Sequence, residues 1–213
     1  MNRAIAIDGP AASGKSSAAK LLSKELGLVM VNSGAMFRAV TWKVLKAGIS
    51  VKDVDAILEL KAAESLECGV DPSGYFSTVG FDGVLLVNEL REEAVNASVS
   101  EISKIPELRN VLMNKQREYL STHDVVIEGR DIGTVIFPET PFKFFFKASE
   151  SIRQARREAE GIHDSIAERD KQDSSRKTAP LIPADDAVII NTEGYDLKGV
   201  VAKVKEDLVR LGW

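Results

Sequence analysis

The sequence predicts an α/β fold whose parallel sheet is covered by helices on both faces. Three observations support this prediction. Short apolar strands alternate with amphipathic helices at both ends of the chain, a glycine-rich loop joins the first strand to the first helix, and a turn-rich insert separates the two ends. The chain has 213 residues, which is enough for one core with an inserted subdomain.

Apolar periodicity places the elements along the chain. The first part is expected to contain strands at residues 4–7 and 28–31 and helices at 15–26, 33–47 and about 51–66. Gly27 and Gly48 follow two of these helices, where glycine suits a helix end. The last part is expected to contain strands at 125–127, 143–146 and 187–190, a helix from about 149 and a final helix at 196–211.

The middle of the chain has a different character. Turn signals at residues 71–74 and 82–83 separate short β-prone runs, which predicts a small antiparallel meander at 68–88. Helices are expected after it at about 89–103 and 106–119. The charged stretch at about 154–177 is expected to be helical with few apolar anchors, which suits a flap that closes over a ligand.

Composition excludes several classes of protein. The net charge is −4, which argues against a protein that neutralises many nucleic-acid phosphates. Cys68 is the only cysteine, so neither an intramolecular disulfide nor a cysteine-based zinc cluster can form. The N-terminal apolar run is too short for a secretory signal, and no run is long enough to span a bilayer. We therefore expect a cytoplasmic protein that binds neither nucleic acid nor membrane.

The glycine-rich loop carries the strongest chemical signal. Gly9, Gly14, Lys15 and Ser16 match the pattern G-x-x-x-x-G-K-[ST], between a strand and a helix. Backbone N–H groups and the helix N-terminus favour phosphate, Lys15 would reach the β- and γ-phosphates, and the Ser16 hydroxyl would bind Mg²⁺. The sequence thus predicts ATP as co-substrate and Mg²⁺ as cofactor, with ATP bound by Gly9, Pro10, Ala11, Ala12, Ser13, Gly14, Lys15, Ser16 and Ser17.

The reaction is indicated by other residues. A kinase whose acceptor is a phosphate needs no strong base, because the acceptor is already ionised with a second pKa of about 6. It needs arginines, which pair bidentately with phosphate oxygens. Arg130 and Asp131 directly follow the strand at 125–127, at the strand end where open α/β sheets bind ligands. Arg38 lies one helical turn beyond Ser33.

With these residues placed, the sequence resembles the bacterial cytidylate kinases over nearly its whole length. The resemblance rests on the segments at 5–16, 32–38, 128–134, 168–170 and 179–181, of which Glu128-Gly-Arg-Asp-Ile-Gly-Thr134 is the most specific. It implies transfer of the γ-phosphoryl group of ATP to CMP or dCMP by a monomer. It also implies the fold of P-loop nucleoside monophosphate kinases, with a five-stranded parallel core sheet at 1–32, 121–152 and 178–213, an acceptor domain containing a small antiparallel sheet at about 33–120, and a short helical lid at about 153–177.

The resemblance also implies roles for individual residues. Catalytic roles fall to Lys15, Arg130, Asp131, Arg156 and Arg157, the last two as lid arginines that meet the transferring phosphate. CMP would be bound by Ser33, Arg38, Ser100, Arg109, Arg130, Asp131, Arg169, Asp173 and Arg176, and the metal by Ser16.

The chain departs from the family pattern at two positions and in one segment. Asn32 stands where the family has Asp, and Phe37 where it has Tyr, which removes a phenol and keeps a ring. The segment between Arg157 and Arg169 is shorter than in many relatives. Two other functions stay open: a kinase for UMP or another small phosphorylated acceptor, and a regulatory nucleotide-binding protein. Arginines spread over separate segments count against the second, because a sensor needs no second phosphate site.

Overall fold

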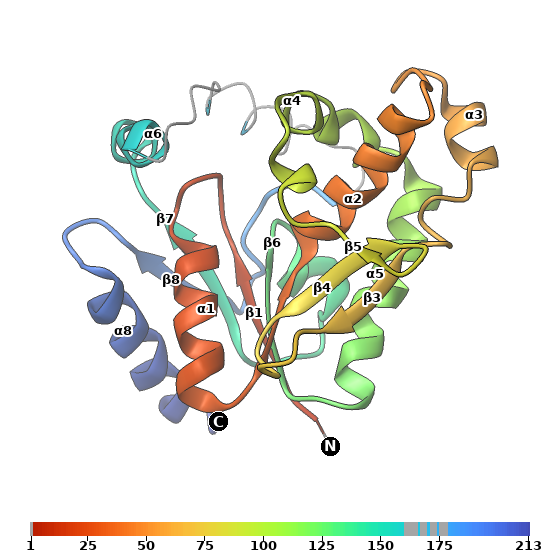
Figure 1. The fold of residues 1–213 in the computed structure, drawn as a ribbon. Coiled ribbons are helices and arrows are strands. Elements are labelled where there is room, and N and C mark those ends of the chain that lie inside the picture. Colours follow the sequence, from red (N-terminus) through yellow and green to blue (C-terminus); the bar gives the residue numbers. More distant parts are fainter. Residues whose placement is uncertain (1, 160–165, 167–169, 171–173, 175–178) are drawn as a thin grey trace.

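The central sheet matches the prediction. In the computed structural model, which describes residues 2–159, 166, 170, 174 and 179–213, five parallel strands lie in the order β2-β6-β1-β7-β8. Their bounds are β1 (Ala4–Asp8), β2 (Val29–Asn32), β6 (Val125–Gly129), β7 (Lys143–Lys147) and β8 (Val188–Asn191). Figure 1 shows the two termini at one pole and the loop between β1 and α1 (Lys15–Leu26) at the other.

Helices cover both faces of this sheet, as expected. Side chains alternate along β1, so that Ile5 and Ile7 pack with α1 and α8 (Leu197–Arg210), while Ala4 and Ala6 face the opposite layer. That layer contains α2 (Ser33–Lys46), α4 (Glu93–Ile102) and α5 (Pro106–Glu118). The sequences of the core strands are mostly apolar without alternation, because both faces of the sheet are buried.

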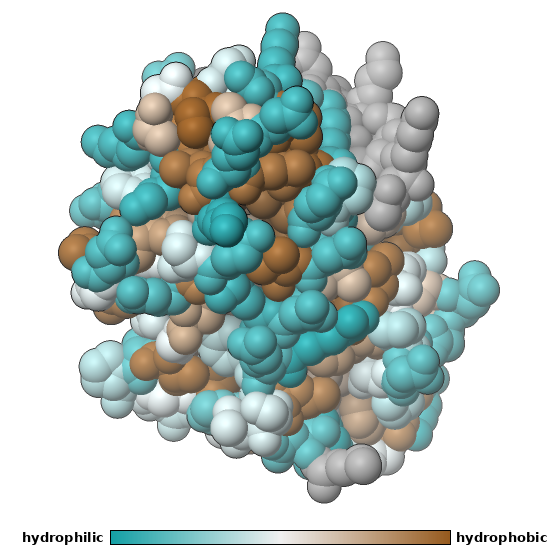
Figure 2. Space-filling model, turned by 90° about the vertical axis from the view of Figure 1, so that its right-hand side faces the viewer, coloured by the Kyte–Doolittle hydropathy of each residue, from teal (hydrophilic) through white to brown (hydrophobic). Residues whose placement is uncertain are grey.

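The insert contains the predicted antiparallel meander, made of β3 (Glu67–Val70), β4 (Ser77–Phe81) and β5 (Val84–Leu85). It is joined to the edge strand β2, where the amide of Met30 donates to the carbonyl of Tyr75 at 2.8 Å. Figure 2 shows hydrophobic residues gathered in the upper middle of the side that carries the insert, with hydrophilic residues around them.

Two expected helices need correction, and one helix was not expected. The helix expected at 51–66 is only α3 (Val54–Glu59), and turns follow it. The helix expected at 89–103 is two elements, η1 (Glu89–Arg91) and α4, because Glu92 has an extended ψ of 141°. After β6 the chain forms a π-helix, η3 (Ile132–Ile136), which periodicity did not predict. Two further helical elements lie in the part of the chain that the structure describes, η2 (Tyr119–Ser121) and α6 (Glu150–Ala159).

The carboxyl ends of the strands converge on one pole of the molecule. The phosphate loop follows β1, α2 follows β2, and the Arg130–Asp131 dipeptide follows β6. Ligands of open α/β sheets bind at this edge. Within the described residues, no helix has both the length and the apolar character needed to cross a membrane.

Candidate active site

Two cavities flank the phosphate loop. The first, of about 220 Å³, lies between this loop, the start of α2, the insert helices α4 and α5, and the end of β6. The second, of about 420 Å³, lies between the loop, α6 and the start of α8. Ala12 of the loop lines both cavities, so ligands in the two cavities would meet at the loop.

The backbone of the phosphate loop requires its first glycine. Gly9 has a φ of +147°, and a Cβ there would lie 2.4 Å from the carbonyl oxygen of Phe146 in β7. The loop therefore lies against the strand next to β1. Lys15 is only 4% exposed, and its Nζ donates to the carbonyl of Pro10 (2.6 Å) and the hydroxyl of Ser13 (3.4 Å). The ammonium is thus held at the loop.

A hydroxyl and a carboxylate meet beneath the loop. Ser16 Oγ donates to Glu128 Oε1 at 2.9 Å, and both side chains line the first cavity. No group of three or more His, Cys, Asp or Glu in the described part of the chain is arranged to hold a metal ion. A hydroxyl with one carboxylate nevertheless fits Mg²⁺ in a nucleotide site, because Mg²⁺ there takes its other ligands from phosphates and water.

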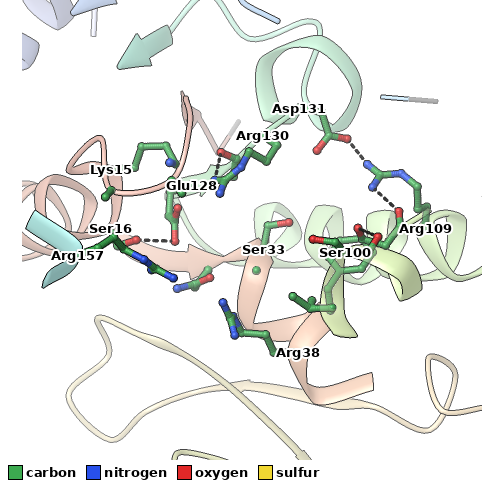
Figure 3. Close-up of a pocket in the computed structure, with 18 residues that line it drawn as sticks. Lys15, Ser16, Ser33, Arg38, Ser100, Arg109, Glu128, Arg130, Asp131 and Arg157 are labelled. Atoms are coloured by element: carbon green, nitrogen blue, oxygen red, sulfur yellow. Dashed lines mark hydrogen bonds and ion pairs between the residues drawn. The ribbon is translucent and has the colours of Figure 1, made fainter. Parts of the chain in front are cut away.

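Basic side chains from four segments face the first cavity. Figure 3 shows Lys15, Arg38, Arg130 and Arg157 around it. Arg38 donates to the carbonyl of Leu90 (3.2 Å) and to Asn96 Oδ1 (2.5 Å), so the insert helps to hold its guanidinium. This concentration of positive charge favours a ligand with several anionic oxygens.

A buried ion pair closes the far end of this cavity. Arg109 donates to the carboxylate of Asp131 and, at 3.1 Å, to the carbonyl of Ser103. Arg109 and Asp131 are 3% and 5% exposed. The guanidinium lies 5.4 Å from the ring centroid of Phe37, so this ring keeps a packing role without a phenol hydroxyl.

The second cavity has a different lining. Arg156 donates to the hydroxyl (3.1 Å) and the carbonyl (3.0 Å) of Thr192 and to the carbonyl of Ala12 (3.3 Å). The other lining residues are Gly14, Ser17, Ala159, Tyr195, Asp196, Leu197 and Val200. The hydroxyl of Thr192 in turn donates to the carbonyl of Ser13, which anchors the phosphate loop from this side.

The structure brings most of the sequence-predicted residues together. The first cavity is lined by Ala11, Ala12, Lys15, Ser16, Ser33, Arg38, Ser100, Arg109, Arg130, Asp131 and Arg157. Arg156 and Ser17 line the second cavity instead, so the two neighbouring lid arginines face different cavities. Arg169, Asp173 and Arg176 lie outside the described residues.

Sequence reasoning missed several residues that support the site. Thr192 is one, and Asp8, whose carboxylate accepts from the amides of Ile132 and Gly133, is another. Arg153 donates to the carbonyl of Ala11 (3.1 Å) and to Asp170, whose carboxylate also accepts from the amide of Ala11 (3.4 Å). A charged residue that ends an apolar strand, as Asp8 does, was the available signal.

The fold and the site define a P-loop kinase with cavities on both sides of its phosphate loop. The family profile of cytidylate kinases matches residues 5–210. The chain is 40% identical to a cytidylate kinase of Caldanaerobacter subterraneus subsp. tengcongensis, over 95% of this chain and 92% of that protein. It is 39% identical to one of Streptococcus pneumoniae strain 70585, over 95% and 96% of the two chains. The chain belongs to the cytidylate kinase family.

A solved structure supports the fold independently. A gluconokinase from Sinorhizobium meliloti 1021 superposes with a TM-score of 0.51 at 15% identity, over 98% of this chain and 93% of that one. At this identity the likeness concerns the fold alone.

Proposed function

We propose that this chain transfers the γ-phosphoryl group of ATP to CMP or dCMP, giving CDP or dCDP. The observation that carries the proposal is the first cavity, where Arg38 and Arg130 face Lys15 of the phosphate loop. A site built only to bind ATP needs no second group of arginines beyond the γ-phosphate. Membership of the cytidylate kinase family supports CMP as the acceptor.

The acceptor would lie along the first cavity. Arg38 and Arg130 would hold its phosphate, since guanidinium pairs bidentately with phosphate oxygens. Ser33 lines the cavity near these arginines and would contact the same phosphate or the sugar. The base would lie at the far end, beside Ser100, Arg109 and Asp131, where the buried ion pair offers donors and acceptors already in position. Arg169, Asp173 and Arg176 are assigned to the ribose and pyrimidine on the family resemblance alone.

The base of ATP would occupy the second cavity. Tyr195, Leu197 and Val200 offer apolar surface there, and the guanidinium of Arg156 lies at its inner end beside the phosphate loop. A purine is flat and largely apolar on its faces, which suits such a lining. On this arrangement Arg156 acts from the donor side of the loop and Arg157 from the acceptor side.

Catalysis would come from positioning and electrostatic stabilisation. Bound Mg²⁺ would neutralise charge on the ATP phosphates, with Ser16 and Glu128 as the residues that hold it. Lys15 would bind the β- and γ-phosphate oxygens, and Arg130 and Arg157 would stabilise charge on the transferring group. Asp131 would act by orienting Arg109. The acceptor oxygen needs no general base, because most of the phosphate is fully ionised at neutral pH.

Closure would complete the site. We assign the core to residues 1–32, 121–152 and 178–213, the acceptor domain to about 33–120 and the lid to about 153–177. Closure of the lid and the acceptor domain would exclude water and suppress ATP hydrolysis. We also expect a monomer that acts in the cytoplasm. Size-exclusion chromatography with light scattering tests the oligomeric state.

A panel of acceptors tests the proposed function. ADP release with ATP and Mg²⁺ is followed for CMP, dCMP, UMP and AMP in a coupled assay. Rapid release with CMP and dCMP is expected, with UMP slower and AMP inactive. Preference for UMP would favour a UMP kinase. ADP release that no acceptor stimulates would favour a regulatory nucleotide-binding protein.

A further inference from the structure

Asp8 is a buried carboxylate next to the phosphate loop that lines neither cavity. It is the last residue of β1, at the centre of the sheet, where it pairs with Gly129 of β6 and Phe145 of β7. Asp8 is only 4% exposed. Burying a carboxylate costs free energy, which hydrogen bonds must offset.

The carboxylate of Asp8 holds the segment that follows Arg130 and Asp131. Asp8 Oδ1 accepts from the amide of Ile132 at 2.8 Å, and Oδ2 accepts from the amide of Gly133 at 2.7 Å. These two amides open the π-helix η3. Consecutive backbone N–H groups that each donate to one oxygen of a carboxylate form short, directional contacts.

The Arg130–Asp131 dipeptide is therefore fixed at both ends to β1. Its N-terminal end follows Gly129, which pairs with Asp8 in the sheet, and its C-terminal end precedes Ile132, which Asp8 binds. Close packing restricts the segment further. A Cβ on Gly129 would lie 2.7 Å from Ile132 Cδ1, and one on Gly133 would lie 3.1 Å from the side chain of Lys143.

The phosphate loop begins one residue after Asp8, at Gly9, whose own position is fixed by the carbonyl of Phe146. The same residue thus links both halves of the reaction centre. We propose that Asp8 is a positioning residue whose carboxylate sets the separation between the phosphate loop and Arg130, and so between the γ-phosphoryl group and the acceptor phosphate. This inference rests on the proposed function.

A carboxylate is required for this role because both of its oxygens accept hydrogen bonds. In Asp8→Asn one oxygen is replaced by an NH₂ group, which donates and would face a second donor, the amide of Ile132 or Gly133. One end of the Arg130–Asp131 segment would be released, while the size of the side chain is kept. Reacting groups need near-contact distances, so a small displacement of Arg130 costs much of the rate.

The experiment compares Asp8→Asn with a matched control, Asp207→Asn. Asp207 is also a buried carboxylate, 2% exposed, but it lies in α8 and pairs with Lys203 and Arg210. For Asp8→Asn we expect kcat/KM for CMP to fall by at least about 30-fold, the Kd for ATP to change less than twofold, and more ADP to form per CDP. For Asp207→Asn we expect unchanged kinetics, whatever its effect on Tm. Normal CMP kinetics in folded Asp8→Asn, or an equal loss of CMP and ATP binding, would overturn the inference.

A second variant covers the case in which Asp8→Asn does not fold. Gly133→Ala keeps the carboxylate and crowds the same segment, because its Cβ would lie 3.1 Å from the side chain of Lys143 and 3.4 Å from Asp8 Oδ2. We expect kcat/KM for CMP to fall by about threefold to tenfold with ATP binding retained, and unchanged CMP kinetics would then overturn the inference. CMP turnover by the wild-type protein tests the proposed function separately. If the wild type does not turn over CMP, the proposed function itself is refuted.

Discussion

The two cavities on either side of the phosphate loop have different linings. The first is lined by Lys15, Arg38, Arg130 and Arg157, together with acidic partners. The second carries one arginine and a larger apolar area from Tyr195, Leu197 and Val200. On the proposed function, the acceptor would be recognised by fixed charge, whereas the base of the donor would be recognised by shape and apolar contact.

The two cavities also differ in the residues that hold their lining side chains in place. Charged groups at a reaction centre act only when they are held in place, and the first cavity has such supports in Asp8, Asn96 and Ser103. Apolar contact needs less support and tolerates small displacements. Substitutions should therefore cost more activity on the acceptor side than on the donor side.

Arg130→Ala should cause the greatest loss. Removing one group that stabilises charge in the transition state costs about 10²- to 10³-fold, and Arg130 would also bind the acceptor phosphate. We expect kcat/KM for CMP to fall by about 10³-fold with KM for ATP nearly unchanged. Steady-state kinetics measure this, with Arg91→Ala, an exposed arginine of η1, as control. Near-normal CMP turnover in Arg130→Ala would refute the assignment.

The buried carboxylate on the acceptor side should lower stability as it ionises. Burial raises the pKa of Asp8 from 3.8 to about 6, with a smaller contribution from Asp131, while the amides of Gly133 and Ile132 and the charge of Lys15 oppose the rise. Because the folded-state pKa is the higher one, the stabilisation is complete below about pH 4 and is lost as pH rises through about 6. The loss amounts to about 3 kcal/mol of unfolding free energy.

Denaturant unfolding between pH 4 and 7 measures this effect. The wild type should lose about 2 kcal/mol relative to Asp8→Asn across that range, and Gly133→Ala, which keeps the carboxylate, should follow the wild type. A constant difference between wild type and Asp8→Asn at every pH would contradict the prediction. The donor cavity has no comparable buried acid among its lining residues.

Ser16→Ala should produce the next largest effect, because Ser16 lines the first cavity and donates to Glu128 there. Loss of the hydroxyl removes the hydrogen-bond donor to Glu128 and would remove the proposed ligand of Mg²⁺, for an expected fall in kcat of about 10²-fold. The Mg²⁺ concentration that gives half-maximal rate should rise as well. Ser23→Ala removes a hydroxyl from the same helix, where it donates to the carbonyl of Lys20 at 3.0 Å, and should leave both values unchanged. An unaltered Mg²⁺ dependence in Ser16→Ala would count against the metal assignment.

Tyr195→Ala should have the smallest effect and should act on the donor alone. The side chain is 57% exposed, and loss of stacking on a base at such a site costs about 1 kcal/mol. KM for ATP should therefore rise about fivefold while KM for CMP stays constant. Tyr195→Phe should behave as the wild type. A change in KM for CMP of equal size would show that Tyr195 does not belong to the donor side.

Much of the fold follows from local sequence patterns. Strand β1 and helix α1 are marked by an apolar run and a 3.6-residue period, and the turn residues at 71–74 indicate the meander. Helix α3 is shorter than its periodicity indicates because the apolar residues at 60–66 pack into the core from turns instead of a continuous helix. The first two amides of the π-helix η3 donate to the carboxylate of Asp8, which precedes Ile132 by 124 residues, and no local sequence pattern reveals such a contact.

Site residues were predictable from the sequence where a motif with fixed spacing indicates their chemical role. The phosphate loop and the position of Arg130 at a strand end follow from spacing alone, and the resemblance added Ser100 and Arg109. The separation of Arg156 from Arg157 was not predictable, because it depends on Thr192, which binds Arg156 across the fold. The pairing of Arg109 with Asp131 likewise arises from tertiary packing between α5 and the end of β6.

A bisubstrate ligand tests most directly whether the two cavities form one reaction centre. In such a ligand five phosphates join the 5′ positions of adenosine and cytidine, and calorimetry gives its Kd and stoichiometry with the wild-type protein. We predict one ligand per chain, bound at least about 100-fold more tightly than ATP or CMP, because both cavities are occupied at once. Arg130→Ala and Tyr195→Ala should each weaken its binding. Binding no tighter than that of ATP would contradict the account.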